Sequence, residues 1–275
     1  MANEESASGK PAAAKTPPKP VNTMPPVNAT TAGDIREALR AGLSDFFRAP
    51  LFGLFFGGVF AAAGIIIVLA MFRWDMPWMI YPFAIGFPLI GPFAAVGFYE
   101  VSRKLEAGQP LVWREVLGVV WAQRGRELSW MAFVMLFFFW IWMYQVRLLI
   151  ALFLARASFS SLERFTNVVF TTDAGLWFLI VGHGVGAVLA LALFSITVIS
   201  IPMLLDREVD IITAMITSVK VVLTSPAPML IWGVIVTLSV IVACLPLFLG
   251  LLVVLPVLGH ATWHLYRKAV APVPV

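Results

Sequence analysis

The chain has 275 residues, of which 60% are hydrophobic and 12% charged, whereas soluble domains are roughly 45–50% apolar and about 25% charged. This composition excludes an ordinary soluble protein and predicts an all-α integral membrane protein whose main partner is the lipid bilayer. The net charge of +4 does not indicate nucleic-acid binding, because the basic residues flank apolar runs instead of forming one patch. The single cysteine, Cys244, has no second thiol for a disulfide or a cysteine-based metal site.

The first segment, residues 1–33, is rich in Pro, Ala, Lys and Thr and lacks the apolar core of a signal peptide. Such a segment buries too little surface to become ordered. We therefore predict a disordered tail over residues 1–33, a membrane domain over residues 34–268 and a short tail over residues 269–275.

The membrane domain contains long apolar runs at residues 51–72, 78–99, 128–155, 177–205 and 229–266. Each of the first four matches the length of about 20 residues that a spanning helix needs. The fifth is too long for one span, and Leu245-Pro246 can divide it into two. The pattern predicts six transmembrane helices, with one long kinked or partly re-entrant element as the alternative for residues 229–266.

The basic residues indicate the orientation of these spans. Most of the Lys and Arg residues precede the first span, follow the last one, or lie between spans two and three and between spans four and five. The positive-inside rule then places both termini in the cytosol, and an even number of spans agrees with that placement.

Three segments that each precede a pair of spans have helical apolar periodicity: residues 34–49, 112–125 and 208–225. Asp34, followed three residues later by Glu37, resembles a capping box with Asp34 as the cap. The apolar faces are Ile35, Leu39, Leu43, Phe46 and Phe47 in the first segment, and Val209, Ile212, Ile216, Val219 and Leu223 in the third. Helices of this kind lie in the headgroup plane with the apolar side toward the membrane.

An internal repeat connects two of these units. Asp34 precedes Pro50 by the same interval that separates Asp210 from Pro226. Further along each unit, a second proline precedes an Arg-Lys pair, and the spacing between the proline and the pair is again the same in both units. This spacing predicts a duplication, with repeat units at about 34–104 and 210–268 and a weaker copy at 112–208.

His260 and His264 lie four residues apart on the last predicted helix, a spacing that suits a metal or haem site. One haem cannot join either of them to His183, because His183 lies near the opposite face of the bilayer. A zinc site would need a third ligand, for which Glu100 and Asp206 are the candidates. We predict instead that both histidines mark the cytosolic end of a helix and face headgroups or neighbouring helices, without a metal or cofactor.

His183 lies inside a Gly182–Gly186 pair, and Gly53 and Gly57 have the same spacing. Small residues four apart let helices approach closely. We predict that His183 makes an interhelical hydrogen bond, and the alternative is a polar group that lines a cavity.

Arg147 lies near the outer end of the third span, where it is predicted to snorkel to the interface; a deeper position would make it a buried functional charge. No Asp or Glu lies within a span, which weakens the case for an ion-coupled carrier. Potential helix breaks do occur, at Gly86-Phe87-Pro88, Gly91-Pro92, Pro202 and Pro246.

No nucleophile–base set, metalloprotease motif or phosphate-binding loop is recognisable, so no catalytic residues are predicted. The weak functional candidates are His183, Arg147, His260, His264 and Glu100. The favoured function is a non-catalytic scaffold, assembly factor or auxiliary subunit with a membrane-protein partner or a second copy of itself. The alternatives are a transporter or channel for a small or lipid-like solute and, less favoured, a haem- or metal-binding redox protein.

The stretch DIREALRAGLSDFFRAP, followed by an apolar span and GFPLIGPFAAVGFYEVSRKLEAGQ, resembles a family of bacterial, chiefly proteobacterial, predicted integral membrane proteins of unknown function. The resemblance extends over about residues 34–268 and implies location in a bacterial inner membrane. Some members carry an automatic label that likens them to cytochrome c oxidase subunit one. This chain has about half the spans of that subunit and lacks its histidine ligands, so the label implies no oxidase activity here.

Overall fold

The computed structural model describes residues 24–74, 80–123, 126–154 and 162–272, and within these it is helical apart from turns, short loops and one isolated β-bridge. The side chains of residues 80–89 and 162 are outside the description. The helices are α1 (Ala32–Arg48), α2 (Pro50–Phe72), α3 (Ile80–Glu106), α4 (Trp113–Ala122), α5 (Glu127–Phe153), α6 (Leu162–Thr171), α7 (Asp173–Thr197), α8 (Ser200–Asp206), α9 (Ile211–Thr224), α10 (Pro226–Cys244) and α11 (Leu251–Ala269).

Helices occupy the described parts of all six predicted spans, but only four of the described helical segments are long and apolar enough to cross a membrane: α2, α5, α7 together with α8, and α10. The other two predicted spans correspond to α3 and α11. The last apolar run divides at Leu245-Pro246 as predicted, through a turn between α10 and α11 in which Leu247 and Phe248 both have positive φ.

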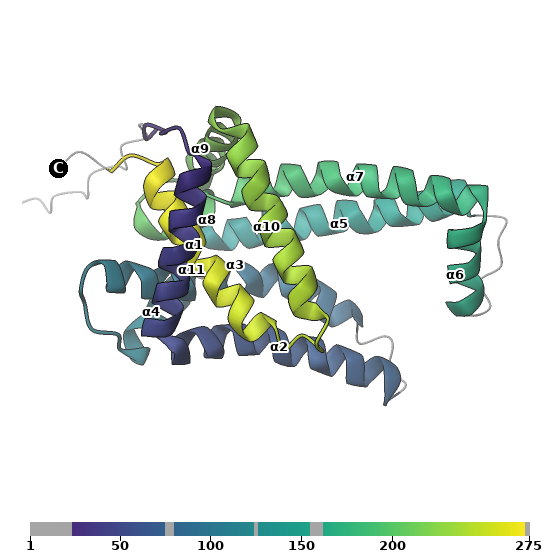
Figure 1. Cartoon of the computed structure of the whole chain (residues 1–275), viewed down its shortest axis with the longest axis horizontal. Helices are drawn as coiled ribbons and strands as arrows, with labels where there is room; N and C mark the ends of the chain where they lie inside the picture. The colour runs from purple at the N-terminus through teal and green to yellow at the C-terminus, as the bar shows by residue number, and fades with distance from the viewer. Residues whose placement is uncertain (1–23, 75–79, 124–125, 155–161, 273–275) are drawn as a thin grey trace, which may run out of the picture.

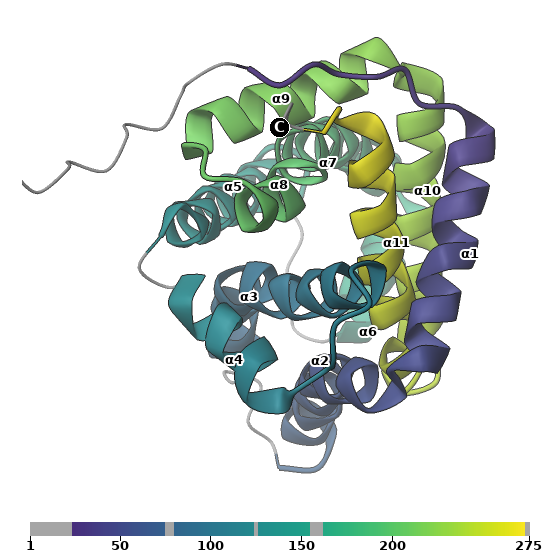
Figure 2. The same ribbon diagram turned by 90° about the vertical axis from the view of Figure 1, so that its left-hand side faces the viewer.

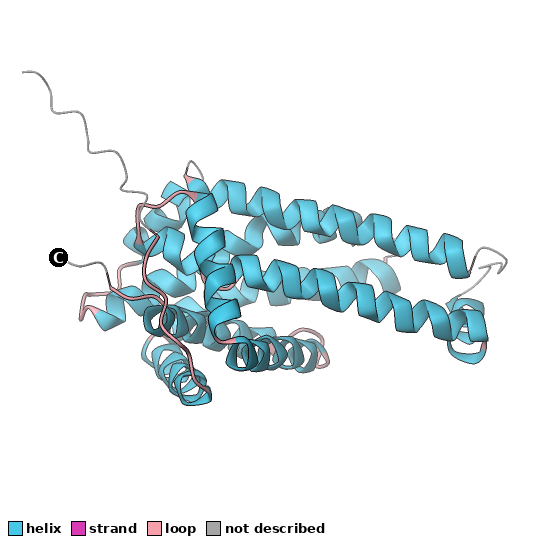
Figure 3. Cartoon of the chain, turned by 90° about the horizontal axis from the view of Figure 1, so that it is seen from above, coloured by secondary structure: helices cyan, strands magenta, loops and turns pink. Residues whose placement is uncertain are grey.

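The helices surround a central group made of α3, α8 and α11, which contact one another. Seen from the end of the molecule, the short helices α1, α4 and α9 lie around this group (Figure 2). The long helices α5 and α7 run side by side away from it, and α6 lies across their far end (Figures 1 and 3). One end of the molecule is therefore densely packed, and the other is a pair of long helices.

Residues 24–33, which the prediction placed in the disordered tail, are ordered, and residues 1–23 of that tail lie outside the described residues. The main chain of residues 26–28 pairs with residues 269–271, and the Thr30 amide donates to the Ser225 hydroxyl at 2.7 Å. The predicted tail is thus too long at its inner end. The capping box also begins earlier than predicted, because Thr31 is the N-cap of α1. The Thr31 hydroxyl accepts from the Asp34 amide, and the Asp34 carboxylate accepts from the Thr31 amide.

The two predicted repeat units share local geometry. The C-cap residue of α1, Ala49, has φ −136° and ψ 51°, and the C-cap residue of α9, Ser225, has φ −136° and ψ 64°. A proline opens the next helix in both. The corresponding residues Ala38 and Ala214 are both fully buried. α4 packs against α3, and α9 packs against α7 and α8, which in each case end the preceding unit. α1, in the first unit, packs instead against α11, the last helix of the third unit.

The apolar faces predicted for the short helices are oriented in two ways. On α9, Ile212, Ile216 and Leu223 are exposed, as expected of a surface that faces lipid. On α1 the prediction is partly wrong, because Ile35 and Phe46 are buried in the protein and only Leu43 and Phe47 are exposed. The physical reason is that α1 lies closely along α11.

Two of the four predicted helix breaks are absent. The α3 helix continues through Gly86-Phe87-Pro88 and Gly91-Pro92. Pro202 itself lies inside α8, and the helix is interrupted one turn earlier, at Val198 and Ile199. A proline cannot donate to the carbonyl four residues before it, which is that of Val198. The Ser218 hydroxyl of α9 accepts a hydrogen bond from the Ile199 amide at 3.1 Å.

Candidate functional site

A buried polar cluster joins three helices at the densely packed end of the molecule. Asp45 of α1, Ser102 of α3 and His260 of α11 have almost no exposed surface. The Ser102 hydroxyl lies 2.8 Å from Asp45 Oδ2 and 2.8 Å from His260 Nδ1. His264 Nε2, one turn along α11, lies 2.8 Å from the same Asp45 oxygen. The four residues are called the polar cluster below.

The single hydroxyl proton of Ser102 determines the direction of these bonds. Ser102 donates to the Asp45 carboxylate, so His260 Nδ1–H must be the donor to Ser102. His264 then donates to Asp45 through Nε2–H. His260 Nε2 is left as a buried atom without a hydrogen-bond partner.

The carboxyl group of Asp45 is stabilised in its ionised form. Burial raises its pKa. The hydrogen bonds from His264 and Ser102, together with the charges of the nearby imidazoles, lower it by a larger amount, so that the net pKa lies below its usual range. Ionised Asp45 is therefore the acceptor on which the polar cluster depends.

Close approach of two backbones brings these residues together. Gly42 lies on the same face of α1 as Asp45, and a Cβ atom at Gly42 would lie 2.6 Å from the Ala261 nitrogen of α11. Glycine is required here because any side chain would overlap the α11 backbone. This contact brings Asp45 to the helix face that carries His260 and His264.

A second network joins the C-terminal ends of the central helices α3, α8 and α11. Asp206 of α8 accepts from the Tyr266 hydroxyl at 2.7 Å and lies 3.4 Å from Arg267. Glu106 of α3 accepts from Trp263 Nε1 at 3.1 Å and pairs with Arg267 at 3.3 Å. These bonds fasten α3, α8 and α11 to one another.

The predicted candidates His260 and His264 therefore face neighbouring helices, which was one of the two environments expected for them. Glu100 does not join them; it is buried and pairs with Arg103 of its own helix at 2.7 Å. Asp206 belongs to the second network. Within the described residues no group of three His, Cys, Asp or Glu side chains is placed to hold a metal ion.

The prediction for His183 is wrong. Its side chain is exposed, and Nδ1 bonds to the Leu179 carbonyl of its own helix at 2.7 Å instead of reaching another helix. The neighbouring glycines do serve helix packing: Gly182 faces Leu149 of α5, and a Cβ at Gly186 would lie 2.9 Å from the Trp142 ring. Because the glycines face α5, His183 points to another side of α7.

The other glycine pair serves the same purpose between α2 and α11. A Cβ atom at Gly57 would lie 2.9 Å from the Leu251 carbonyl oxygen, and one at Gly53 would lie 3.1 Å from Pro256. The small-residue pairs in both spans therefore mark sites of close helix approach, as predicted.

A row of aromatic side chains on α5 was not singled out by the sequence analysis. Trp130, Phe133, Phe137, Trp140 and Tyr144 are each between 50% and 64% exposed. Their spacing alternates between three and four residues, which keeps them on one helix face and is the pattern of a helix-packing seam. This spacing was the available signal, and it was hidden within a segment that is apolar almost throughout. We call these five residues the aromatic seam.

Arg147 lies on the same face, one step beyond Tyr144 in this spacing, and its side chain is exposed. It is not buried in the protein, and snorkelling to the interface stays a prediction. At the other end of the seam, a pocket of about 350 Å³ lies between α5 and α9 and is lined in part by Trp130, Phe133 and Met215.

Comparison with protein families agrees with the apolar helices. Residues 80–206, from the start of α3 to the end of α8, match the model of a family described as "Predicted integral membrane protein (DUF2189)". The chain is an integral membrane protein. The match covers less than half of the chain, a shorter stretch than the resemblance noted from the sequence. The searches of curated proteins and of solved structures gave no match.

Proposed function

We propose that this membrane protein is a non-catalytic scaffold or auxiliary subunit that binds another membrane protein through the aromatic seam of α5. In this proposal six helices cross a bacterial inner membrane, both termini are cytosolic, and the helical units arose by duplication. The similar α1–α2 and α9–α10 junctions support the duplication, and the distribution of Lys and Arg supports the orientation.

The exposure of α5 is the observation that supports a partner. Only Leu128, Met131, Ala132 and Leu149 of its 27 residues are buried. Hydrophobicity alone does not drive association in lipid, because acyl chains are as apolar as leucine. Helix association in lipid is driven by close packing, and a regular aromatic seam allows large rigid side chains to pack closely against a second helix.

Arg147 narrows the class of partner. It belongs to a candidate membrane span, and no described residue pairs with it. A second copy that packed in parallel on the same seam would place Arg147 against Arg147. The seam therefore fits a transmembrane helix of a different protein that carries an Asp or Glu near the end of its span, within reach of Arg147.

A catalytic role for the polar cluster is not favoured by its geometry. In a nucleophile–base set the histidine lies between the serine and the carboxylate, whereas here Ser102 lies between Asp45 and His260. Ser102 also has no exposed surface. The cluster is better suited to joining α1, α3 and α11.

A transporter would need polar groups along a path through the membrane. The two pockets described between the helices are lined by apolar side chains and Cys244, and neither includes His183 or Arg147. We therefore retain the scaffold as the proposed function.

Photo-crosslinking in native membranes tests the proposal. A photoactivatable phenylalanine analogue replaces Phe137, and in a matched variant it replaces Ile241, an exposed residue of α10. We expect one stoichiometric protein adduct from position 137 and none from position 241, and loss of the adduct in Arg147→Gln. Lipid adducts alone, or the same protein adduct from both positions, would refute the proposal.

A further inference from the structure

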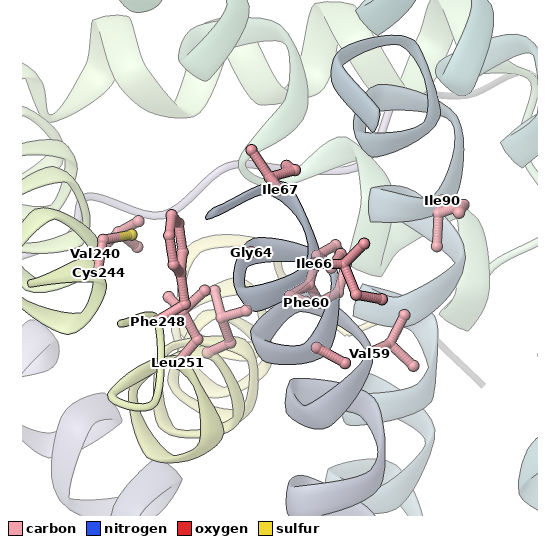
Figure 4. Close-up of a pocket in the computed structure, with 13 residues that line it drawn as sticks. Val59, Phe60, Gly64, Ile66, Ile67, Ile90, Val240, Cys244, Phe248 and Leu251 are labelled. Carbon is pink, nitrogen blue, oxygen red and sulfur yellow. The ribbon is translucent and has the colours of Figure 1, made fainter. Parts of the chain in front are cut away.

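A pocket of about 620 Å³ lies beside α2, with walls from α2, α3, α10, the α10–α11 turn and α11 (Figure 4). Every side chain that lines it is apolar except the thiol-bearing Cys244. We call this pocket the α2 groove. It shares no residue with the aromatic seam or the polar cluster.

A strained turn shapes this groove. Leu247 and Phe248 have φ of 51° and 65°, values that are unusual for large side chains and that cost about 1–3 kcal/mol each. The ring of Phe248 rests against Gly64, where a Cβ atom would lie only 2.3 Å from it. The turn thus places an aromatic ring between α10 and α2, in view in Figure 4.

The position of the groove determines the chemistry of its occupant. Both α2 and α10 are candidate membrane spans, and the lining residues Val59 and Ile67 are in the interior of α2. The groove therefore lies at the depth of the hydrocarbon core, where bilayer lipid is the apolar molecule at hand.

The volume favours an acyl chain over a protein helix. A helix is about 10 Å across, so 620 Å³ would hold only about one and a half turns of it. A polymethylene chain is about 4–5 Å wide, given the contact distance between carbon atoms, and the same volume holds a much longer stretch of it.

A cation lies in line with the groove. Val59, Ile66 and Arg73 follow one another at intervals of seven residues and thus share one face of α2. Arg73 is the C-cap of α2, about 10 Å beyond Ile66 along the axis. Its side chain is exposed and has no ion pair among the described residues. A guanidinium group binds phosphate oxygens through two parallel hydrogen bonds.

We propose that the α2 groove binds one acyl chain of an anionic phospholipid whose phosphate pairs with Arg73. Transfer of the chain from bilayer to groove gains no hydrophobic free energy, because both surroundings are apolar. The selectivity of the site therefore comes from Arg73, and a lipid with uncompensated negative charge is preferred to a zwitterionic one.

Native mass spectrometry of the full chain counts the bound lipid. The chain is released from vesicles of phosphatidylcholine and phosphatidylglycerol in equal amounts. We expect one retained phosphatidylglycerol. It should be lost in Ala62→Phe, which fills the groove, and kept in Ala187→Phe, which places the same ring on an exposed position of α7. Arg73→Gln should remove the preference for phosphatidylglycerol, whereas Arg40→Gln, an exposed position of α1, should not.

The single cysteine gives a second measurement that needs no substitution. Cys244 lines the groove, so phosphatidylglycerol added to delipidated wild-type protein should slow its reaction with a maleimide several-fold, and phosphatidylcholine should slow it less. Equal lipid retention in Ala62→Phe and Ala187→Phe, or a Cys244 reaction rate that phosphatidylglycerol leaves unchanged, would overturn the proposal. Neither result bears on the partner of α5.

Discussion

The helices α5 and α11 show opposite relations between composition and environment. α5 is apolar enough to be a candidate span, yet few of its residues are buried in the protein. α11 contains the polar residues His260, His264, Arg267 and Lys268 and is not among the helices apolar enough to cross a membrane. About half of its residues are nevertheless buried in the protein. In a membrane protein, apolar side chains can face lipid, and polar side chains need protein partners. Of these two helices, the more hydrophobic one is therefore the less enclosed.

The largest expected effect comes from separating α1 from α11. In Gly42→Leu the new side chain would overlap the backbone of Val257 and Ala261, and overpacking against backbone should cost about 3 kcal/mol or more. We expect a loss of folded protein by size exclusion and a lower unfolding temperature in detergent. The control is Gly118→Leu on α4, where a Cβ atom would have no neighbouring atom within 4 Å. Equal stability of the two variants would show that the contact between α1 and α11 is not tight.

The next effect comes from removing the acceptor of the polar cluster. Asp45→Ala leaves the donors of Ser102 and His264 without their shared acceptor, and breaking a buried pair in this way should cost about 2–4 kcal/mol. Thermal unfolding of the purified protein measures it. Arg48→Ala removes only the exposed partner of Asp45 and should cost less than about 1 kcal/mol. If both variants were equally stable, Asp45 would not be a structural acceptor.

The partners of Asp45 explain what the sequence could and could not predict. Apolar runs of spanning length predicted α2, α5 and α10 to within a few residues, because hydropathy and helix length are local properties. The bonds of His260 and His264 to Ser102 and Asp45 join residues that are far apart in sequence. A signal for α1 existed in Ala38, Gly42 and Asp45, a stripe of small and polar residues on one face. On α9 the equivalent stripe includes Thr213, Ala214 and Thr217 and is buried, while the apolar face is outside.

Acid should weaken the packed end of the molecule before it affects the α5–α7 pair. The pKa of Asp45 is lower in the folded protein than its usual value of about 3.9. Ionised Asp45 therefore contributes stability that is fully present above about pH 4 and is lost as the pH falls through the lower, folded pKa. We expect the stability difference between wild type and Asp45→Asn to shrink below about pH 4 in thermal unfolding. A difference that stayed constant down to about pH 2 would contradict the lowered pKa.

The smallest expected effect on stability belongs to the aromatic seam, and this is what distinguishes it from a core. Phe137→Ala removes a ring that is 63% exposed and should change the free energy of unfolding in detergent by less than about 0.5 kcal/mol. Met131→Ala, on the buried side of the same helix, should cost about 2–5 kcal/mol. Thermal unfolding of the two variants measures this contrast. A large loss in Phe137→Ala would mean that the seam already packs within the chain, and it would then not be free to bind a second helix.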